Sequence, residues 1–382
     1  DVGNPWLDAG IVPFSTMSSD WFPADFITES FPGQFKNWFY SLIAMGTALK
    51  NTNPFKIVLG FASVRDEKGE EMHKSRGNAI EFNEAADKIG VDVMRWIYTR
   101  QDPEQNLNFG YHVANEVRRQ FHLLLWNVYN FFVTYAIVDK WNPQDEKMGE
   151  KSQHVLDRWI LSRLHGTIQI VTNALAEYKA HIASRTIEDF VNDVSLWYIR
   201  RSRNRVGPAA EDESDKDAFY STCHYVLTKL CKLLAPFTPF MAEEMYENLT
   251  GDESVHLASW PMIDRSLYNE HLEIEMDNGM RLASVIHAFR KSATLKVRIP
   301  LRTLTYNGPA PLSDEVRKVV QDEINVHKLV FGGKSKEYTV VGDKSEKNQD
   351  LVAGEARDII RHIQAKRKDL GVALDQYVIV SL

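Results

Sequence analysis

Cysteine is nearly absent from this chain of 382 residues, in which Cys223 and Cys231 are the only two. Two thiols are too few for a disulfide framework or for the four-ligand set of a structural zinc site, and both lie in an apolar helical pattern. We therefore expect two buried helix residues, no zinc site in this chain, and a protein that works in the reducing cytoplasm.

Basic residues are also in the minority. Lys and Arg number 45 against 52 Asp and Glu, which gives a formal net charge of −7. This balance excludes a surface coated in positive charge, so any surface that binds nucleic acid must be local. No apolar run approaches the ~18 residues of a membrane span and no signal peptide is present, so we expect no membrane partner. Because Asp1 stands where an initiator Met would be, we expect a fragment of a longer protein.

The rest of the composition is that of an ordinary globular protein, with 44% hydrophobic and 25% charged residues. The length predicts roughly two or three domains. Residues 1–110 mix aromatic segments with short strand-like and helix-like ones, residues 111–265 follow a helical period, and residues 266–382 return to a mixture. We predict a multidomain α+β fold that is mostly helical.

Residues 1–110 are predicted to contain part of a nucleotide-binding sheet. The pattern over residues 39–49 indicates a buried helix, and the short apolar segment 55–61 indicates a strand. Gly90 indicates the end of one helix and Asp92 the start of the next. A strand, a glycine turn and a helix in this order are typical of the edge of an α/β sheet that binds nucleotides.

The middle and the end of the chain are predicted to form two further domains. Three- and four-residue spacings indicate four to five long helices in residues 111–265, which we expect to pack as an antiparallel bundle with an acidic, solvated connector at 211–217. We predict a small α/β domain over residues 266–382, with helices at 276–292 and 354–369 and strands at 303–306, 326–331, 338–341 and 376–380.

One polar segment carries the chemistry: residues 70–78, Glu-Glu-Met-His-Lys-Ser-Arg-Gly-Asn, which we call the signature loop. Lys74 supplies a mobile positive charge, Ser75 a hydroxyl, and Gly77 allows the backbone to approach an anion closely. The same residues are common in exposed turns. On these residues alone, a phosphate-binding loop and a solvated turn both stay open.

The signature loop resembles the Lys-Met-Ser-Lys-Ser motif of class I aminoacyl-tRNA synthetases, which in that family is often followed by x-Gly-Asn. The second Lys, the last Ser and the Gly-Asn pair are present as Lys74, Ser75 and residues 77–78. Two positions depart from the motif, because Glu71 replaces its first Lys and His73 its first Ser.

Further segments resemble the isoleucine/valine/leucine branch of this family, and isoleucyl-tRNA synthetases in particular, in the same order along the chain. They are residues 5–10, 29–39, 156–162, 193–203, 234–240, 296–301 and 323–327. The resemblance implies three parts. They are the C-terminal part of a Rossmann-type catalytic domain (1–110), an antiparallel helical-bundle anticodon-binding domain (111–265) and a small C-terminal α/β domain (266–382).

Carried over by position, the resemblance implies a site for the amino acid and its adenylate. Trp6 and Trp38 would flank the isoleucine side chain, since two indole faces form a flat slot; the alternative for either Trp is packing in a core. Glu29 and Gln34 would hydrogen-bond the aminoacyl-adenylate. Gly33 stands where the family has Asp, so this part of the pattern departs as well.

The resemblance also implies that the signature loop binds ATP. The carboxylate of isoleucine would attack the α-phosphorus of ATP, and a loop cation would stabilise the charge that shifts onto the departing pyrophosphate. We predict Lys74 as this catalytic cation, with Arg76 as the second candidate and Mg²⁺ sharing the phosphates. The predicted ATP-binding residues are Met72, His73, Lys74 and Ser75.

The predicted tRNA-binding residues are Arg200, Arg203 and Arg205, which follow an aromatic pair in the sequence. Arginines around aromatics at a helix end can bind phosphates and stack on an unpaired base. For Arg201, tRNA binding and a salt bridge to a carboxylate of the bundle stay open. Residues 366–368, Lys-Arg-Lys, fit either a second phosphate contact or a solvated helix end.

Two parts of the family pattern have no match in this sequence. No His-x-Gly-His occurs among its 12 histidines, and no editing domain precedes Trp6. We therefore expect the missing N-terminal half of the catalytic domain to be needed for activity, and this chain to be inactive alone. The expected substrates and partner are isoleucine, ATP and tRNA(Ile). Valine or leucine specificity, and a tRNA-binding module without catalysis, are the alternatives.

Overall fold

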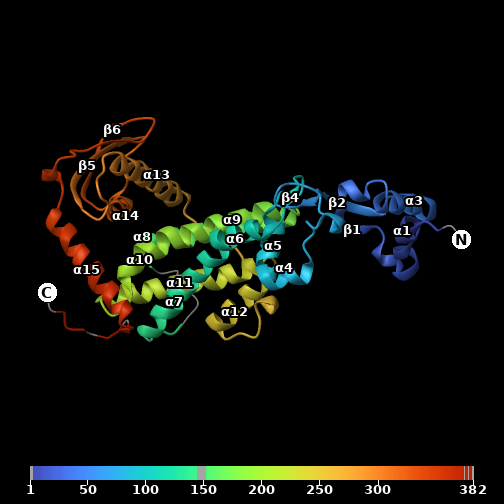
Figure 1. Ribbon diagram of the computed structural model, residues 1–382, viewed down its shortest axis with the longest axis horizontal. Helices are drawn as coiled ribbons and strands as arrows, with labels where there is room; N and C mark the ends of the chain where they lie inside the picture. Colours follow the sequence, from blue (N-terminus) through green and yellow to red (C-terminus); the bar gives the residue numbers. More distant parts are fainter. Residues whose placement is uncertain (1–2, 144–151, 374, 377, 381–382) are drawn as a thin grey trace. The chain divides into compact units, whose positions relative to one another are not determined.

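Figure 1 shows the computed structural model, which describes residues 3–143, 152–373, 375–376 and 378–380. Most of these residues lie in helices, as predicted. The chain divides into two compact units. The first comprises the residues up to 123 with 170–188 and 234–242, and the second comprises the remainder.

A β–α–β arrangement opens the first unit. Strands β1 (Ala24–Ser30) and β2 (Phe55–Phe61) pair in parallel, and helices α2 (Phe31–Gln34) and α3 (Trp38–Lys50) connect them. Helix α1 (Pro5–Thr16) packs closely on α3, where a Cβ on Gly10 would lie 2.8 Å from Ser41. The helix predicted at 39–49 and the strand predicted at 55–61 are confirmed, whereas β1 was not predicted.

A second parallel pair follows. Strands β3 (Val64–Arg65) and β4 (Leu107–Asn108) lie side by side, and between them in the chain come helices α4 (Phe82–Ile89) and α5 (Val91–Arg100). Gly90 separates these helices with a φ of 86°, a conformation that glycine adopts without strain. The predicted helix boundary at Gly90 is thus confirmed.

Trp96 of α5 is the centre of the packing in this unit. Its indole is fully buried and stacks on Phe121, with 3.7 Å between the ring centroids and 3° between the planes. Phe237 meets the same indole edge-on, and Arg95 fixes that segment by donating to the carbonyl oxygens of Pro236 and Phe237. Pairs of this kind stabilise a core beyond the area they bury.

Helix α6 (Tyr111–Val117), a π-helical segment (Arg118–His122) and helix α7 (Leu123–Val138) form one continuous helical stretch. By length and composition this stretch could cross a membrane, which the sequence analysis did not recognise. Apolar residues on one side of it are buried inside the protein, and the core helix of a soluble protein has the same composition. The buried residues are Ala114, Val117, Phe121, Leu125, Val128 and Phe132.

The buried imidazole of His122 gives a stability prediction. Desolvation by burial lowers the pKa of His122 from its usual 6.5 to about 4. Between these two pH values the unfolded chain binds a proton that the folded chain does not, so stability is complete above pH 6.5 and falls as the pH drops toward 4. We expect the free energy of unfolding, measured in urea, to rise less steeply with pH in His122→Leu than in the wild type. Between pH 4 and 6.5 the slope should be smaller by up to ~1.4 kcal/mol per pH unit.

The prediction concerns the difference between the wild type and His122→Leu in unfolding free energy at each pH. The difference is needed because Asp193 changes the stability of both proteins with pH in the opposite sense. Desolvation by burial raises the pKa of Asp193 to about 6, so its contribution falls as the pH rises from 3.8 to 6. Asp193 is unchanged in both proteins and cancels. Above pH 7 the two curves should run parallel. Equal slopes between pH 4 and 6.5 would show that His122 titrates as it does in the unfolded chain.

Further helices, most of them long, continue along the chain. They are α8 (Val155–Ala176), α9 (Ala180–Asp193), a π-helical segment (Val194–Ile199), α10 (Arg200–Ser202), α11 (Glu213–Leu234) and α12 (Pro239–Thr250). Cys223 and Cys231 lie buried on α11, as predicted. The connector predicted at 211–217 is wrong over most of its length, because α11 begins at Glu213. Acidic residues in a first turn complement the helix dipole, which explains this early start.

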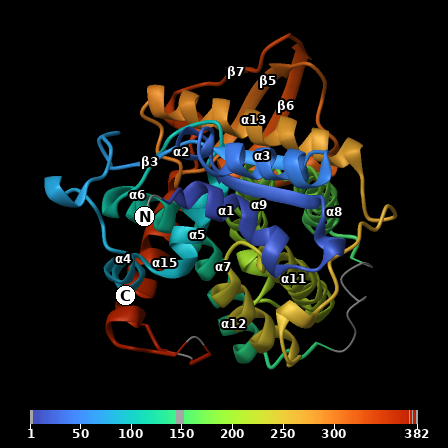
Figure 2. The ribbon, with the colours of Figure 1, turned by 90° about the vertical axis from the view of Figure 1, so that its right-hand side faces the viewer.

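The C-terminal part is a small α/β arrangement. Strands β5 (Leu301–Gly308), β6 (Val326–Lys334) and β7 (Thr339–Val341) form a sheet in the order β6-β5-β7, in which β5 runs parallel to β6 and antiparallel to β7. Helix α13 (Glu270–Ser292) lies beside this sheet (Figures 1 and 2). Helix α14 (Asp314–Ile324) connects the two parallel strands, and α15 (Leu351–Asp369) follows.

The predicted helices and the first three predicted strands of this part are confirmed. Helix α14 was not predicted. The strand predicted at 376–380 is wrong, since Gln376 and Val378–Val380 form no strand; Tyr377 lies outside the described residues. The antiparallel packing of the bundle and the three domain boundaries stay predictions.

Candidate functional site

The signature loop begins at the edge where two parallel strands end. The turn 66–69 follows β3 and leads into the loop, while Gly110 and helix α6 follow β4. Because the carboxyl ends of parallel strands share one edge, the loop and the start of α6 are neighbours. They enclose a pocket of about 550 Å³, lined mainly by residues 66–70, 76–80 and 109–111.

Asn78 and Asp66 hold the loop. The side chain of Asn78 accepts from the backbone N–H of His73 (2.9 Å) and donates to the Oδ2 atom of Asp66 (2.9 Å) and to the carbonyl oxygen of Glu71 (3.1 Å). Asp66 also accepts from the N–H of Lys68, at 2.9 Å. The hydrogen bond from Asn78 lowers the pKa of Asp66, so the clamp favours the carboxylate. Neither role was predicted from the sequence.

This clamp leaves the predicted ATP-binding side chains at the surface. Lys74 opens a 3₁₀ turn (Lys74–Arg76) that Gly77 ends with a φ of 70°. His73, Lys74 and Ser75 are exposed and Met72 is half-buried. In the described part of the chain, the Lys74 ammonium has no ion-pair partner, so its charge is available to an anion.

The two departures from the family motif lie against each other. The Nε2 atom of His73 is 3.5 Å from the Oε2 atom of Glu71, and both side chains are largely exposed. The carboxylate of Glu71 therefore has a partner within the loop. An exposed pair at this distance contributes little to stability.

Glu29 and Gln34 each make one local hydrogen bond. Glu29, near the end of β1, accepts from the N–H of Ser30 (2.8 Å), and Gln34 accepts from the N–H of Trp38 (3.2 Å). The Gln34 carbonyl thus satisfies a free amide at the start of α3, which leaves its –NH₂ group to donate. Within the described residues, the second carboxylate oxygen of Glu29 and the amide nitrogen of Gln34 make no hydrogen bond, which leaves them available to a ligand.

The two predicted indoles lie at the starts of α1 and α3, helices that pack against each other. Trp6 is 37% exposed and lies in the first turn that Asn4 caps, while Trp38 is half-buried against Phe39. Among the described residues no ring contact joins Trp6 to Trp38. Neither indole is sealed in a core.

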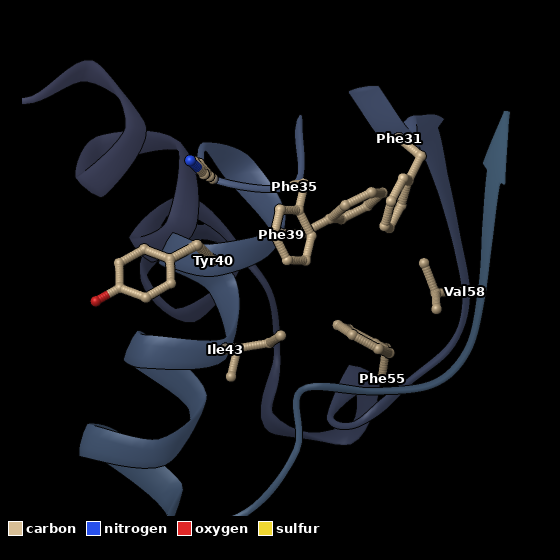
Figure 3. A pocket seen from close by; sticks show the side chains of 8 residues that line it. Phe31, Phe35, Phe39, Tyr40, Ile43, Phe55 and Val58 are labelled. Carbon is tan, nitrogen blue, oxygen red and sulfur yellow. The ribbon is translucent and has the colours of Figure 1, made fainter. Parts of the chain in front are cut away.

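An apolar pocket of about 420 Å³ lies beside these motifs and was not predicted (Figure 3). Its lining comes from α2, the two residues that follow it, α3 and β2, and the side chains of Phe31, Phe35, Phe55 and Val58 face a common space. Phe31 lies in α2, Phe35 directly follows that helix and Phe39 lies in α3, so these aromatics come together by the packing of two helices and not by the face of one.

The prediction for Arg205 is wrong. Its side chain is 5% exposed, and its guanidinium donates to Asp157 through two bonds of 2.7 Å and to Asp215 at 2.8 Å. Asp157 is fully buried and also accepts from Tyr198, at 2.9 Å. A guanidinium that neutralises a buried carboxylate is not available to RNA, so Arg205 has a structural role.

Arg200 and Arg201 share the carboxylate of Glu323 on α14. The Nε atom of Arg201 lies 3.1 Å from Glu323, which supports the salt-bridge alternative, although the carboxylate belongs to α14 and not to the bundle. Arg200 pairs with the same carboxylate at 2.5 Å while its side chain stays 45% exposed. His287 completes the cluster at 3.2 Å.

Arg203 remains exposed and lines an open pocket of about 570 Å³. Its guanidinium lies 6.0 Å from the ring centroid of Phe131, a cation–π distance. Tyr135 and Arg367 line the same pocket, and Arg367 donates to the carbonyl oxygen of Ala373 at 2.9 Å. Two arginines and a tyrosine thus face one cavity, which is the chemistry that phosphates and unpaired bases require.

Comparisons with known proteins support the motif assignments. Residues 1–110 match the family model "tRNA synthetases class I (I, L, M and V)", and residues 157–305 match "Anticodon-binding domain of tRNA ligase". Isoleucine–tRNA ligases are similar to this chain: that of Dehalococcoides mccartyi strain CBDB1 is 36% identical over 99% of this chain and 40% of its own length. The isoleucine–tRNA ligase of Clostridium tetani is 36% identical over 88% of this chain and 34% of its own length.

Two solved structures share the fold. LeuRS of Agrobacterium radiobacter K84, in a ternary complex with tRNA and LeuAMS, aligns with a TM-score of 0.50 and 14% identity over 89% of this chain and 42% of its own. Methionyl-tRNA synthetase of Mycobacterium tuberculosis, in complex with methionyl-adenylate, aligns with a TM-score of 0.52 and 18% identity, over 63% of this chain and 49% of its own. The chain spans about 40% of the length of the curated relatives it matches. This chain belongs to the class I tRNA synthetases of the isoleucine, leucine, methionine and valine group.

Proposed function

We propose that the full-length protein is an isoleucine–tRNA ligase, which activates isoleucine with ATP and transfers it to tRNA(Ile) in the cytoplasm. The observation that carries this proposal is the 36% identity to an isoleucine–tRNA ligase over 99% of the chain. The signature loop supports it chemically, because a clamped loop presents an unpaired Lys74 at the carboxyl edge of a parallel pair of strands.

In the proposed reaction, the isoleucine carboxylate attacks the α-phosphorus of ATP and pyrophosphate leaves. Lys74 stabilises the negative charge that develops on the departing phosphates, which lowers the barrier because the interaction strengthens in the transition state. Gly77 and the 3₁₀ turn give the phosphates room to approach the backbone. The amide of Gln34 and the second carboxylate oxygen of Glu29 would bind the polar groups of the adenylate, which is consistent with the single local hydrogen bond that each side chain makes.

Mg²⁺ would accompany the ATP. The described residues contain no group of three carboxylate, histidine or cysteine side chains that would hold a metal ion. Mg²⁺ in sites that bind nucleotides is commonly held by the phosphates together with one or two carboxylates.

The test of isoleucine specificity is Trp38→Ala in the full-length protein. We expect KM for isoleucine to rise by roughly 10–100-fold, since the loss of a buried aromatic contact costs ~1.5–3 kcal/mol, while KM for ATP stays within a factor of two. Tyr40→Ala, an exposed aromatic on the same helix, is the matched control. Equal losses for isoleucine and ATP would remove Trp38 from the side-chain slot.

The test of tRNA binding is the salt dependence of the Arg203→Gln variant. Removal of one phosphate contact should weaken tRNA binding and lower the slope of log Kd against log salt by roughly 0.7–0.9. Lys229→Gln is a control for the loss of one positive charge elsewhere on the helices. An unchanged slope for Arg203→Gln would place the RNA away from Arg203 and its pocket.

A further inference from the structure

Glu67, in the turn before the signature loop, caps helix α6. Its Oε1 atom accepts from the backbone N–H groups of His112 (2.5 Å) and Val113 (3.4 Å). Amides at the start of a helix have no partner inside the helix, so a carboxylate there satisfies them and also interacts well with the helix dipole. Nothing in the proposed reaction requires Glu67 at this place.

Gly110 makes room for the cap. A Cβ on Gly110 would lie 2.1 Å from the Cγ atom of Glu67 and 2.5 Å from its Oε1 atom. The φ of Gly110 is 172°, an extended value that any residue adopts, so an alanine there would be unstrained in its backbone. Its methyl group would only displace Glu67. The contact can therefore be broken independently from either side.

A continuous path of bonds runs from this cap to Lys74. Glu67 is adjacent to Asp66, which accepts from Asn78, and Asn78 in turn accepts from the N–H of His73, directly before Lys74. The paired strands β3 and β4 fix the chain directly before Asp66 and directly before Gly110, since the N–H of Phe109 donates to the carbonyl oxygen of Arg65 at 2.8 Å.

We propose that Glu67 is a positioning residue for the signature loop. Its cap on α6 fixes the turn 66–69, the turn fixes Asp66 and Asn78, and these set where Lys74 meets the phosphates of ATP. The inference rests on the function proposed above for Lys74. A cap that only stabilises α6 would instead act locally, without effect on the loop.

The experiment uses the full-length protein with four variants: Glu67→Ala, Gly110→Ala, the double variant, and Glu67→Gln, in which the amide oxygen can still accept. Glu70→Ala is the matched control, because within the described residues its carboxylate makes no hydrogen bond or ion pair. Hydrogen exchange is followed in peptides that cover residues 71–75 and 110–114, together with KM for ATP and for isoleucine in pyrophosphate exchange.

We expect Glu67→Ala and Gly110→Ala each to speed amide exchange roughly fivefold at His112 and at His73, as loss of a typical N-cap would. KM for ATP should rise severalfold while KM for isoleucine is unchanged. The double variant should show the same exchange rates and the same KM for ATP as either single variant, since all three break the same contact between Glu67 and the start of α6. Glu67→Gln should recover most of the protection.

Faster exchange at His112 with no change at His73 and in KM for ATP would overturn the proposal, because the cap would then act on α6 alone. Additive effects of Glu67→Ala and Gly110→Ala would overturn it too. Faster exchange at His73 with unchanged ATP kinetics would support the positioning of the loop and contradict the proposed role of Lys74.

Discussion

Arg205→Met should lower the free energy of unfolding by about 3–5 kcal/mol, because it leaves the fully buried carboxylate of Asp157 without its positive partner. The apolar side chain of Met fills similar space, so the effect comes from the stranded charge more than from a cavity. Urea unfolding at pH 7 measures it. Adding Asp157→Asn to the variant removes the charge and should return part of the loss.

Arg203→Met is the matched control, two residues away in the sequence and exposed. Its free energy of unfolding should stay within about 0.5 kcal/mol of the wild type, as for most surface substitutions. We therefore expect the substitution of Arg205 to lower stability and the substitution of Arg203 to weaken tRNA binding. Similar stability losses for both would contradict the buried network around Asp157.

Lys74→Ala in the full-length protein should reduce kcat for pyrophosphate exchange by roughly 10²–10³-fold, the cost of removing one group that stabilises transition-state charge. KM for isoleucine should change little, since Lys74 is expected to act on the phosphates. The melting temperature should be unchanged, because Lys74 is exposed and has no ion-pair partner in the described residues.

Lys68→Ala tests whether position or mere charge matters. Lys68 is also an exposed cation and lies in the turn before the signature loop. A general electrostatic attraction for ATP would make both variants lose activity equally, and more so at low salt. A loss confined to Lys74→Ala supports a specific contact, whereas full activity of Lys74→Ala would remove it from the reaction and leave Arg76 as the candidate.

Much of the fold could be predicted from local pattern. The strand 55–61 is short, apolar and β-branched, and Gly90 ends a helix with a backbone conformation that favours glycine. Strand β1 was not predicted because its sequence, Ala-Asp-Phe-Ile-Thr-Glu-Ser, is half polar and its partner β2 lies about thirty residues further on. A strand of this kind is specified by its pairing and not by its composition.

The residues proposed for the site could be chosen from the sequence, and their roles stay predictions; their contacts could not be predicted. Lys74, Ser75 and Gly77 follow from residue chemistry, whereas the bond from Asn78 to Asp66 spans twelve residues of loop and the cap by Glu67 spans forty-five. Arg205 was misassigned for the same reason. Its sequence neighbours are basic and polar, and its burial depends on Asp157, 48 residues earlier. Long-range partners decide whether a charged side chain is buried or exposed.

The most direct test of the proposed function is amino-acid-dependent exchange of labelled pyrophosphate into ATP by the full-length protein, with isoleucine, valine and leucine compared at equal concentration. We expect exchange with isoleucine to exceed exchange with valine by about 10–200-fold in kcat/KM, the discrimination that one methylene allows; the isoleucine enzyme is the known example of this limit. Leucine should be weaker still. Preference for valine or leucine would contradict isoleucine specificity, and no exchange with any of the three would contradict a ligase.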